Sequence, residues 1–505
     1  MRMKLVSLLS GIALLCLGAC SPTKELVEVP YQELYRPQFH FTPAINWTND
    51  PNGLVYYDGE YHLFYQYNPF RSTWGHMSWG HAVSKDLLHW EHLPIALHEY
   101  LDPRTDDSTM VFSGTVVIDK NNTSGLCSGK ECMVAIYTSH VHSKGQTVVQ
   151  HQSLAYSNDK GRTWTRYDKN PVLDMELKDF RDPKVFWFEP EQKWVMAVVV
   201  PDQYVVRFYE SKNLLSWTQT GEFGKKGDIR KIWECPDLYE VPVEDKPNQK
   251  KWVLSLSCSH PQGQSFVGMQ YFVGSFDGKT FQPDEQDVKT RYVDYGKDFY
   301  AGIVYNNYVT ESGSPVMIGW ANNWAYGASI PTEPWRSAMS IPRELSLRDT
   351  PDGMQLVQKP ISATSTLKGE AVSVNFEGNN LWLEVEIEAG KSDDAGIRIL
   401  KGGISETVIG YRSSNHSVYM DRTRSGFVSF HPDFASEEST VIEPINGKIQ
   451  LEILVDESIV EVFVNGGLRT ISDQVFPSEA ELKTEIFGAG VSVKGWKMKS
   501  AWVKD

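Results

Sequence analysis

Three acidic residues stand in short strings that could hold a carboxyl group in place. Asp50 lies in NDPNG, Asp182 in FRDP and Glu234 in WECPD. Hydrolysis of a glycosidic bond needs one carboxyl group as a nucleophile or base and another as a proton donor, and a third can hold ring hydroxyls while positive charge develops. The three strings could therefore cleave a glycoside. Taken singly, each acid could instead be a turn residue or the partner of a buried cation.

A repeated sheet would explain how acids so far apart in the chain could meet. A serine, a polar turn and an aromatic residue recur in strings that end at Trp90, Trp164, Trp217 and Phe281. Each interval could hold one four-stranded sheet with its loops, which is typical of a β-propeller. Residues at matching places in different blades would then converge on the axis. The alternative is a set of ordinary hairpin turns in a β-sandwich.

The last part of the chain has a different composition. Residues 349–369 are rich in Pro, Gly, Ser and Thr, which predicts a linker. Beyond it, residues 381–387 alternate apolar and acidic side chains, and the run 453–464 ends at Asn465-Gly466. These patterns are typical of antiparallel strands with one solvated face. We therefore expect an all-β chain that ends in a β-sandwich domain at 370–505.

The first residues predict a targeting segment. Arg2 and Lys4 precede an apolar run, 5–17, that is too short to span a bilayer. The string LGAC at 17–20 resembles a bacterial lipobox. We expect residues 1–19 to be a lipoprotein signal peptide that is removed, Cys20 to carry lipid, and residues 20–34 to be a tether. The alternative is a plain secretory signal peptide with an accidental cysteine.

A lipid at Cys20 would place the mature protein in a bacterial cell envelope, attached to a membrane and facing the periplasm or the cell surface. No later apolar run is long enough for a membrane span. The net charge of −15 disfavours nucleic acid as a partner. The 16 Trp and 23 Tyr favour carbohydrate, because sugar faces stack on flat amphipathic rings. No obligate protein partner is implied.

The cysteines indicate neither a metal nor a redox centre. Cys127 and Cys132 could close a small disulfide in an oxidising envelope. Cys235 and Cys258 have no metal-like partners in the sequence, so we expect two buried thiols. We expect Cys235 to pack under Glu234.

Three longer strings resemble the signature motifs of glycoside hydrolase family 32. They are WTNDPNG at 47–53, FRDP at 180–183 and ECPDLY at 234–239. Further strings agree with the family, among them PTEPWRSAMSIPREL at 331–345 and LVDESIVEVFVNGG at 454–467. The resemblance runs from about residue 35 to the end of the chain. Thr48 stands where Met is common in the family, from which we expect a changed pocket wall at most.

The resemblance implies a five-bladed β-propeller catalytic domain, here 35–348, followed by the β-sandwich, and retaining hydrolysis of β-fructofuranosidic bonds. By position, Asp50 would be the nucleophile, Glu234 the general acid/base and Asp182 the transition-state stabiliser. Retention predicts the two reacting carboxyls at roughly 5 to 5.5 Å from each other. We expect Asp50 to be charged, Glu234 to be protonated and the pH profile of the rate to be bell-shaped. No cofactor and no metal are needed.

Five further residues suit a fructose unit: Asn49, Gln66, Trp74, Ser113 and Arg181. Asn49, Gln66 and Ser113 could equally satisfy buried backbone groups. Four other tryptophans could line the pocket or belong to the core, namely Trp47, Trp233, Trp320 and Trp335.

These inferences predict a β-fructosidase that acts on levan, inulin or fructo-oligosaccharides and releases terminal fructose. Endo-acting cleavage, sucrose as substrate and transfer of fructose to a sugar acceptor remain open. An inverting glycosidase acting on arabinose or xylose would hold its carboxyls about 6.5 to 9.5 Å apart. A non-catalytic fructan-binding lipoprotein is the alternative from another functional class. The sandwich could be a binding module or a brace for the propeller, and we favour the brace.

Overall fold

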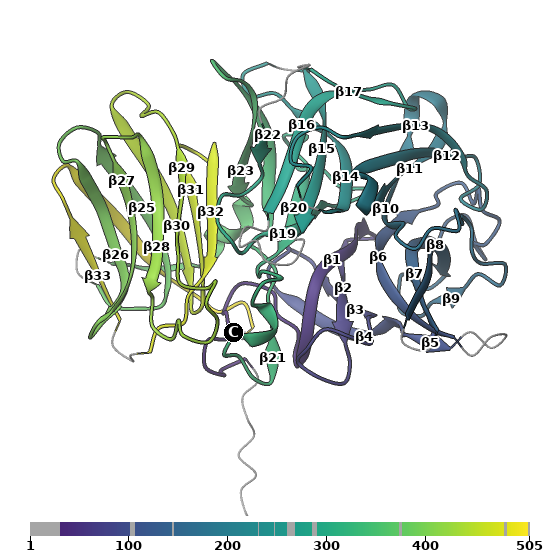
Figure 1. Ribbon diagram of the computed structural model, residues 1–505, viewed down its shortest axis with the longest axis horizontal. Helices are drawn as coiled ribbons and strands as arrows, with labels where there is room; N and C mark the ends of the chain where they lie inside the picture. The colour runs from purple at the N-terminus through teal and green to yellow at the C-terminus, as the bar shows by residue number, and fades with distance from the viewer. Residues whose placement is uncertain are drawn as a thin grey trace, which may run out of the picture.

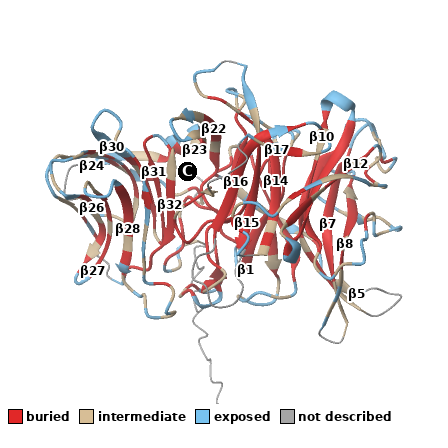
Figure 2. Cartoon of the chain, turned by 45° about the horizontal axis from the view of Figure 1, so that its top comes forward, coloured by how far each residue is buried: buried red, intermediate tan, exposed pale blue. Residues whose placement is uncertain are grey.

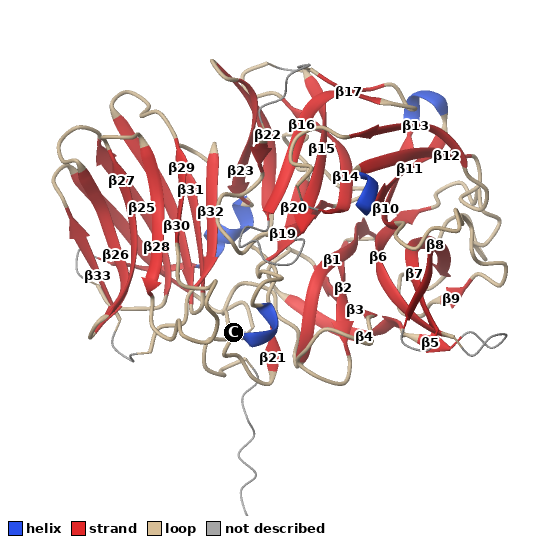
Figure 3. Cartoon of the chain, in the orientation of Figure 1, coloured by secondary structure: helices blue, strands red, loops and turns tan. Residues whose placement is uncertain are grey.

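The structure, a computed structural model, describes residues 31–101, 107–143, 146–230, 232–246, 248–259, 268–284, 290–372, 376–478 and 482–502. The predicted signal peptide, Cys20 and most of the predicted tether lie outside these ranges. Within them the chain is mainly strand, with short 3-10 helices η1 (Glu189–Glu191), η2 (Pro201–Gln203), η3 (Gly327–Ser329) and η4 (Ser362–Leu367) (Figure 3). The predicted all-β class is confirmed. In these ranges no helix has the length and apolar character needed to cross a membrane.

Five sheets surround a common axis and form the five-bladed propeller (Figure 1). Blade I contains β1 (Asn46–Tyr57), β2 (Glu60–Asn68), β3 (Ser78–Ser84) and β4 (Trp90–Leu97). Blade II contains β5 (Tyr100–Leu101), β6 (Ser108–Ile118), β7 (Met133–Ser143), β8 (Gln146–Ser157) and β9 (Thr165–Arg166). Blade III contains β10 (Arg181–Phe188), β11 (Lys193–Val200), β12 (Val205–Ser211) and β13 (Thr218–Gly224). Blade IV contains β14 (Ile232–Pro242), β15 (Lys250–Ser259), β16 (Gly268–Phe276), β17 (Phe281–Pro283) and β18 (Arg291–Tyr292). Blade V contains β19 (Tyr300–Val304), β20 (Val316–Trp320), β22 (Arg343–Thr350) and β23 (Gly353–Pro360).

The innermost strands β1, β6, β10, β14 and β19 contact one another in sequence around the axis, and β19 returns to β1. Each of them interrupts its regular pairing with the next strand of its blade. The interruptions fall at Thr48/Pro51, Val111/Gly114, Arg181/Lys184, Glu234/Asp237 and Tyr300/Ile303. Such bulges re-aim side chains. The same local device therefore occurs in all five blades at the place where side chains face the axis.

A short strand from late in the chain completes the ring. β21 (Trp335–Arg336) pairs in parallel with the start of β1, with Asn46 opposite Trp335 and Trp47 opposite Arg336. The chain reaches β21 after β20 of blade V and then returns to blade V for β22 and β23. The chain therefore passes through β19 and β20 of blade V before it supplies the last strand of the blade I sheet.

The segment expected as a linker at 349–369 is largely part of the fifth blade. β22 runs to Thr350, and β23 pairs with it along its whole length. Thr350 lies opposite Gly353 at one end, and Arg343 lies opposite Pro360 at the other. Pro351 and Asp352 are the turn residues of this hairpin, and the polar residues of its two strands give the segment the composition of a loop. The propeller therefore extends to Pro360, and η4 separates it from β24 of the sandwich.

The second domain is a β-sandwich of two sheets. One contains β24 (Lys368–Val372), β34 (Val491–Met498), β25 (Asn380–Glu388), β30 (Lys448–Asp456), β31 (Ile459–Val464) and β32 (Arg469–Gln474). The other contains β29 (Glu437–Val441), β28 (Ser417–Arg424), β27 (Ser405–Arg412), β26 (Asp394–Gly402) and β33 (Lys483–Phe487). Aliphatic side chains between the sheets form its core, and both domains show buried strand faces (Figure 2).

The two domains share one continuous apolar interface. Phe41 and Tyr65 of the propeller side belong to the same buried cluster as Leu454 and Phe463 of the sandwich. Asp456 of β30 accepts hydrogen bonds from the backbone N–H groups of Gln38, Phe39 and His40. This is the contact that a brace requires.

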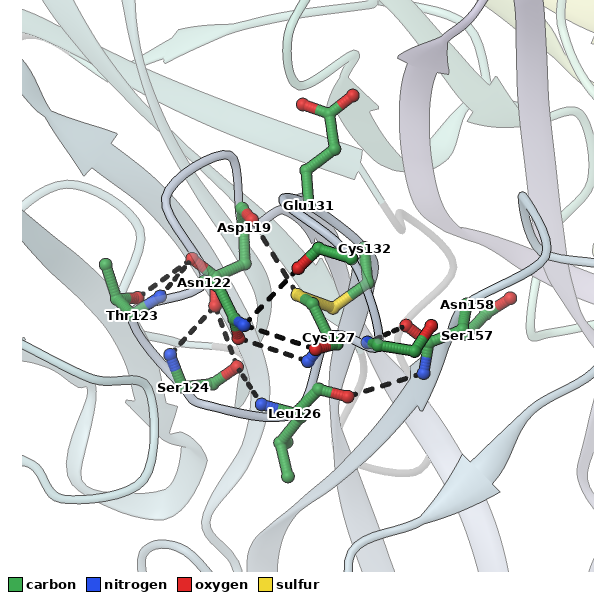
Figure 4. Close-up of a disulfide and its surroundings, with 12 residues drawn as sticks. Asp119, Asn122, Thr123, Ser124, Leu126, Cys127, Glu131, Cys132, Ser157 and Asn158 are labelled. Carbon is green, nitrogen blue, oxygen red and sulfur yellow. Dashed lines mark hydrogen bonds between the residues drawn. A yellow bond between two sulfur atoms is a disulfide. The ribbon is translucent and has the colours of Figure 1, made fainter.

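A disulfide links Cys127 and Cys132 in the loop between β6 and β7 (Figure 4). Asp119, at the start of this loop, accepts hydrogen bonds from the backbone N–H groups of Thr123 and Ser124. The Thr123 hydroxyl in turn accepts a hydrogen bond from Trp194 of blade III at 2.9 Å. The closed loop therefore joins blades II and III at their outer contact. Cys235 and Cys258 are buried, as expected.

Candidate active site

A cavity of about 730 Å³ opens at one end of the propeller axis. It collects side chains from blades I to IV and from two loops that lie further along the chain. All eight residues expected in the site line it: Asn49, Asp50, Gln66, Trp74, Ser113, Arg181, Asp182 and Glu234. The remaining lining residues are Phe112, His140, His142, Thr147, Gln150, Asp179, Trp324, Ala325, His431 and Asp433.

The bulges of the innermost strands direct the acids into this cavity. Asp182 has φ of 62° and Cys235 has φ of 46°, both in the left-handed region that non-glycine residues seldom adopt. Each lies in the irregular stretch of its strand, between Arg181 and Lys184 or between Glu234 and Asp237. Local backbone strain of this kind costs on the order of 1–3 kcal/mol and is retained where the surrounding structure enforces it. Here it positions the groups around the axis.

Asp50 is buried at the bottom of the cavity and is held by two donors. The Ser113 hydroxyl donates to Oδ2 at 2.7 Å, and the Asn49 amide donates to Oδ1 at 3.0 Å. Asn49 is itself fixed by Trp47, whose indole N–H donates to its carbonyl oxygen at 2.8 Å. Burial raises the pKa of Asp50, the two hydrogen bonds oppose part of this rise, and the charge of Glu234 adds to it.

Glu234 is oriented by an arginine and a tyrosine from different blades. Arg181 donates to Oε1 from Nε at 3.2 Å and from Nη2 at 2.9 Å. The Tyr300 hydroxyl donates to Oε2 at 2.5 Å. Although burial opposes its charge, Arg181 has a pKa above the ordinary value because the carboxylates of Glu234, Asp182 and Asp179 surround it. The protonated form of Glu234 expected for a general acid stays a prediction.

Asp182 lies between the other two acids. Its Oδ2 accepts the backbone N–H of Cys235 at 3.0 Å and lies 3.8 Å from Arg181 Nε. Burial is the main reason that its pKa rises to about 7; Arg181 opposes the rise, and the charges of Glu234 and Asp50 add to it. Three carboxyl groups that influence one another in this way titrate together rather than independently.

That Cys235 packs under Glu234 stays a prediction; its thiol contacts two aspartates of the site. Its Sγ lies 3.5 Å from Asp50 Oδ2 and 3.7 Å from Asp182 Oδ2. The bulge at this position turns Cys235 toward the axis, so the thiol contacts the two aspartates. Burial raises the pKa of the thiol well above its ordinary value, and the neighbouring carboxylates add to this, so the group is neutral. It is a weak donor to the acids rather than a nucleophile.

The polar residues expected to bind sugar have structural partners as well. Gln66 donates to the backbone carbonyl of Val111 at 3.1 Å while its side chain lines the cavity. Thr48 is fully buried and donates to the carbonyl of Gln66, so it supports this wall from behind without lining the cavity.

Of the tryptophans, Trp74 lines the rim of the cavity with 44% of its surface exposed. Trp47, Trp233, Trp320 and Trp335 are buried in core clusters. The core alternative is therefore correct for all four.

Several lining residues were not found by sequence reasoning. Phe112 and Asp179 stand next to or near recognised motif residues, and that adjacency could have indicated them. Tyr300 contacts Glu234 from another blade, which no local pattern shows. His431 and Asp433 come from the sandwich domain, and nothing in their sequence context indicates that they reach the cavity. Within the described residues, no cluster of three or more His, Cys, Asp or Glu could hold a metal ion.

Comparison with known proteins gives consistent results. The model of the glycosyl hydrolases family 32 N-terminal domain matches residues 40–360, and that of the family 32 C-terminal domain matches residues 345–503. A levanase of Bacillus subtilis is 44% identical over 497 residues, which cover 94% of this chain and 72% of that protein. An extracellular exo-inulinase of Aspergillus awamori is 40% identical over 519 residues, which cover 94% of this chain and 96% of that protein.

Solved structures agree with the sequence matches. The crystal structure of the exo-inulinase from Aspergillus awamori superposes with a TM-score of 0.87 at 39% identity, covering 94% of this chain and 100% of that one. A β-fructofuranosidase from Schwanniomyces occidentalis, complexed with fructosyl-erythritol, superposes with a TM-score of 0.82 at 32% identity, covering 94% of this chain and 99% of that one.

Proposed function

The chain belongs to glycoside hydrolase family 32, and we propose from this that it is a retaining β-fructofuranosidase that removes terminal fructose from levan, inulin or fructo-oligosaccharides. One observation carries the proposal: Asp50, Asp182 and Glu234, from three different blades, line one cavity together with polar side chains suited to sugar hydroxyls. The levanase, exo-inulinase and β-fructofuranosidase named above support the choice of substrate class.

In the proposed reaction the Asp50 carboxylate attacks the anomeric carbon of a fructosyl unit. As the bond to the leaving oxygen breaks, Glu234 transfers its proton to that oxygen, and a fructosyl ester forms on Asp50. Glu234, now a carboxylate, removes a proton from water, and the resulting oxygen attacks the same carbon and releases Asp50. Two displacements at one carbon restore its configuration. Asp182 contacts the fructose hydroxyls and balances the positive charge that develops on the ring.

The closed end of the cavity supports terminal release. Below the acids, Lys184 forms a buried ion pair with Asp237, with Nζ 3.1 Å from Oδ1, and donates to the carbonyl of Val304 at 3.0 Å. These contacts join the innermost strands β10, β14 and β19, and none of the three residues lines the catalytic cavity. A chain end can enter the cavity, whereas an internal segment would need an open groove.

Product analysis on levan, inulin and sucrose in parallel tests the proposal. Wild-type protein is expected to release fructose from both polymers from the start of the reaction, and Asp50→Ala is expected to release none. A ladder of oligosaccharides from the polymers would instead establish internal cleavage. Absence of any reducing sugar from the wild-type protein would support the binding-protein alternative.

The stereochemistry separates retention from inversion. NMR of the first-formed product should show the β-anomer of fructose before it equilibrates. An initial α-anomer would contradict the role of Asp50 as a nucleophile and would support the inverting alternative.

We also propose that Cys20 carries lipid and holds the mature protein in a bacterial cell envelope. The lipobox-like string at 17–20 supports this. Expression in a bacterial host with radiolabelled palmitate should label the wild-type protein in the membrane fraction. Cys20→Ala should abolish the label and move the protein to the soluble fraction, and a labelled Cys20→Ala variant would contradict the proposal.

A further inference from the structure

The wall of the catalytic cavity is not built from the propeller alone. His431 and Asp433 line it, and both lie in the sandwich loop that joins β28 to β29. We call residues 425–436 the sandwich loop. A domain that holds none of the three acids therefore contributes two polar side chains to the space that the substrate would occupy.

The sandwich loop is firmly attached to the propeller. Lys297 donates from Nζ to the backbone carbonyl of Asp433 at 2.9 Å. Phe434 is fully buried, with its ring centroid 5.3 Å from that of Tyr326. Near the end of β28, just before the loop, the buried Arg422 donates to Asp298 at 2.6 Å and to the Tyr326 hydroxyl at 2.7 Å. These contacts fix the loop's backbone beside the cavity.

The two lining side chains remain accessible although the loop is anchored. The side chain of His431 is 25% exposed and that of Asp433 is 46% exposed. The backbone N–H of Asp433 donates to Nδ1 of His431 at 3.2 Å. A neutral imidazole whose Nδ1 accepts a hydrogen bond carries its proton on Nε2. The pair therefore presents one N–H donor and one carboxylate acceptor, which match two hydroxyls of a sugar ring.

A row of aromatic residues connects this pair to Glu234. Tyr300, which donates to Glu234, has its ring 6.4 Å from that of Trp320, and Trp320 is 4.8 Å from Trp324. Trp324 lines the cavity, and Tyr326, two residues further on, is 6.1 Å from the His431 ring. The acid that protonates the leaving oxygen lies next to the leaving sugar, so this wall faces the leaving-group side.

We propose that the sandwich loop forms a saccharide subsite on the leaving-group side, in which His431 and Asp433 hydrogen-bond a sugar beyond the first leaving unit. Trp324 lies between Glu234 and His431 in this series of contacts and lines the cavity, so in the proposal the first leaving sugar sits over Trp324 and the next reaches the loop. The inference rests on the proposed β-fructofuranosidase activity. It assigns the sandwich a part in choosing longer substrates over sucrose.

The test compares an inulin-type tetrasaccharide with sucrose. The double substitution His431→Ala/Asp433→Ala should lower the ratio of kcat/KM for the tetrasaccharide to kcat/KM for sucrose about tenfold, as expected for the loss of two hydrogen bonds to sugar. His416→Ala is the matched control. His416 is an exposed histidine paired with Glu443 at the other end of β28, so its removal should leave the ratio as in wild type. Equal losses on both substrates in the double variant would overturn the subsite.

A binding measurement separates the subsite from the catalytic proposal. In an Asp50→Ala background, calorimetry with the tetrasaccharide should show about tenfold weaker binding when His431 and Asp433 are both alanine. Unchanged binding would overturn the subsite even if the wild-type enzyme is active. Failure of the wild-type protein to release fructose from any substrate would overturn the proposed function, while the binding comparison would still decide the subsite.

Discussion

Removal of the Ser113 hydroxyl should shift the acid limb of the pH profile of kcat/KM. In the proposed mechanism activity requires ionised Asp50, so the rate should fall as the pH drops through the pKa of Asp50. Burial raises that pKa above the ordinary value of 3.8, and the Ser113 hydrogen bond, which stabilises the charged form, lowers it. Ser113→Ala should therefore raise the pKa of Asp50 further and shift the acid limb of kcat/KM to higher pH.

The control for this shift is a second buried serine that lies outside the cavity. Ser139 donates to Ser153 at 2.7 Å, so Ser139→Ala should leave the acid limb in place. If the acid limb of the Ser113→Ala variant is unchanged or moves to lower pH, the proposed role of Asp50 as the nucleophile is contradicted.

Individual site residues were predictable where a motif carries them. Asp50, Asp182, Glu234 and their motif neighbours could be placed in one cavity from sequence. The direction of the Cys235 side chain could not, because it depends on a bulge that turns one residue of β14. Tyr300 was missed because its partner, Glu234, lies in another blade and only tertiary packing brings the two together.

Among the elements, the loop closed by Cys127 and Cys132 has a measurable effect on stability. The two cysteines are five residues apart in sequence, so the disulfide closes a short loop and should contribute about 2 kcal/mol by restricting the unfolded chain. Reduction with dithiothreitol should lower the melting temperature of the wild-type protein. The Cys127→Ser/Cys132→Ser variant should melt at the lower temperature with or without reductant. A reductant effect of equal size in the double variant would show that the disulfide is not its source.

The propeller was predictable from the repeats, but its last hairpin was not. Residues 349–360 contain prolines, a glycine and many polar side chains, which together resemble a linker. In the structure Leu345, Leu347, Leu356 and Val357 are buried, and the polar Gln355 and Gln358 are buried with them. Composition alone does not separate such a hairpin from a loop, because both contain turn residues and polar side chains.

At the scale of the whole molecule, a buried ion network ties the two domains together. Arg343 of β22 is 2.9 Å from Asp294 of the propeller and 3.1 Å from Glu461 of the sandwich, and all three are buried. Arg343→Met would remove the cation that these two carboxylates share and should cost about 3–5 kcal/mol. The melting temperature should fall, and the connection at 361–367 should become more sensitive to protease.

Arg412→Met provides the surface comparison for this network. Arg412 pairs with Glu437 where both side chains are about one third exposed, so its loss should cost about 0–1 kcal/mol. Similar melting temperatures for the two variants would contradict a central role of the buried network.

The same interface predicts how stability depends on pH. His40 is fully buried; burial alone would lower its pKa, but hydrogen bonds and charge from Asp456 and Glu461 outweigh this and raise it from 6.5 to about 9. A raised pKa means that the folded state holds the proton more tightly than the unfolded state. The stabilisation is therefore complete below about pH 6.5 and is lost as the pH rises through about 9.

Melting temperatures measured between pH 6 and pH 10 should show this decline. His40→Gln should melt lower than wild type at pH 6 and should show a smaller decline toward pH 10. A wild-type melting temperature that rises over this range would contradict the charged state of His40.

The pairing of β21 with β1 also determines when the protein can fold during synthesis. β1 leaves the ribosome early, but its partner at Trp335 is translated much later, on the order of tens of seconds at roughly 5–20 residues per second. Until then the nascent chain cannot close into a ring, whichever blades have already formed.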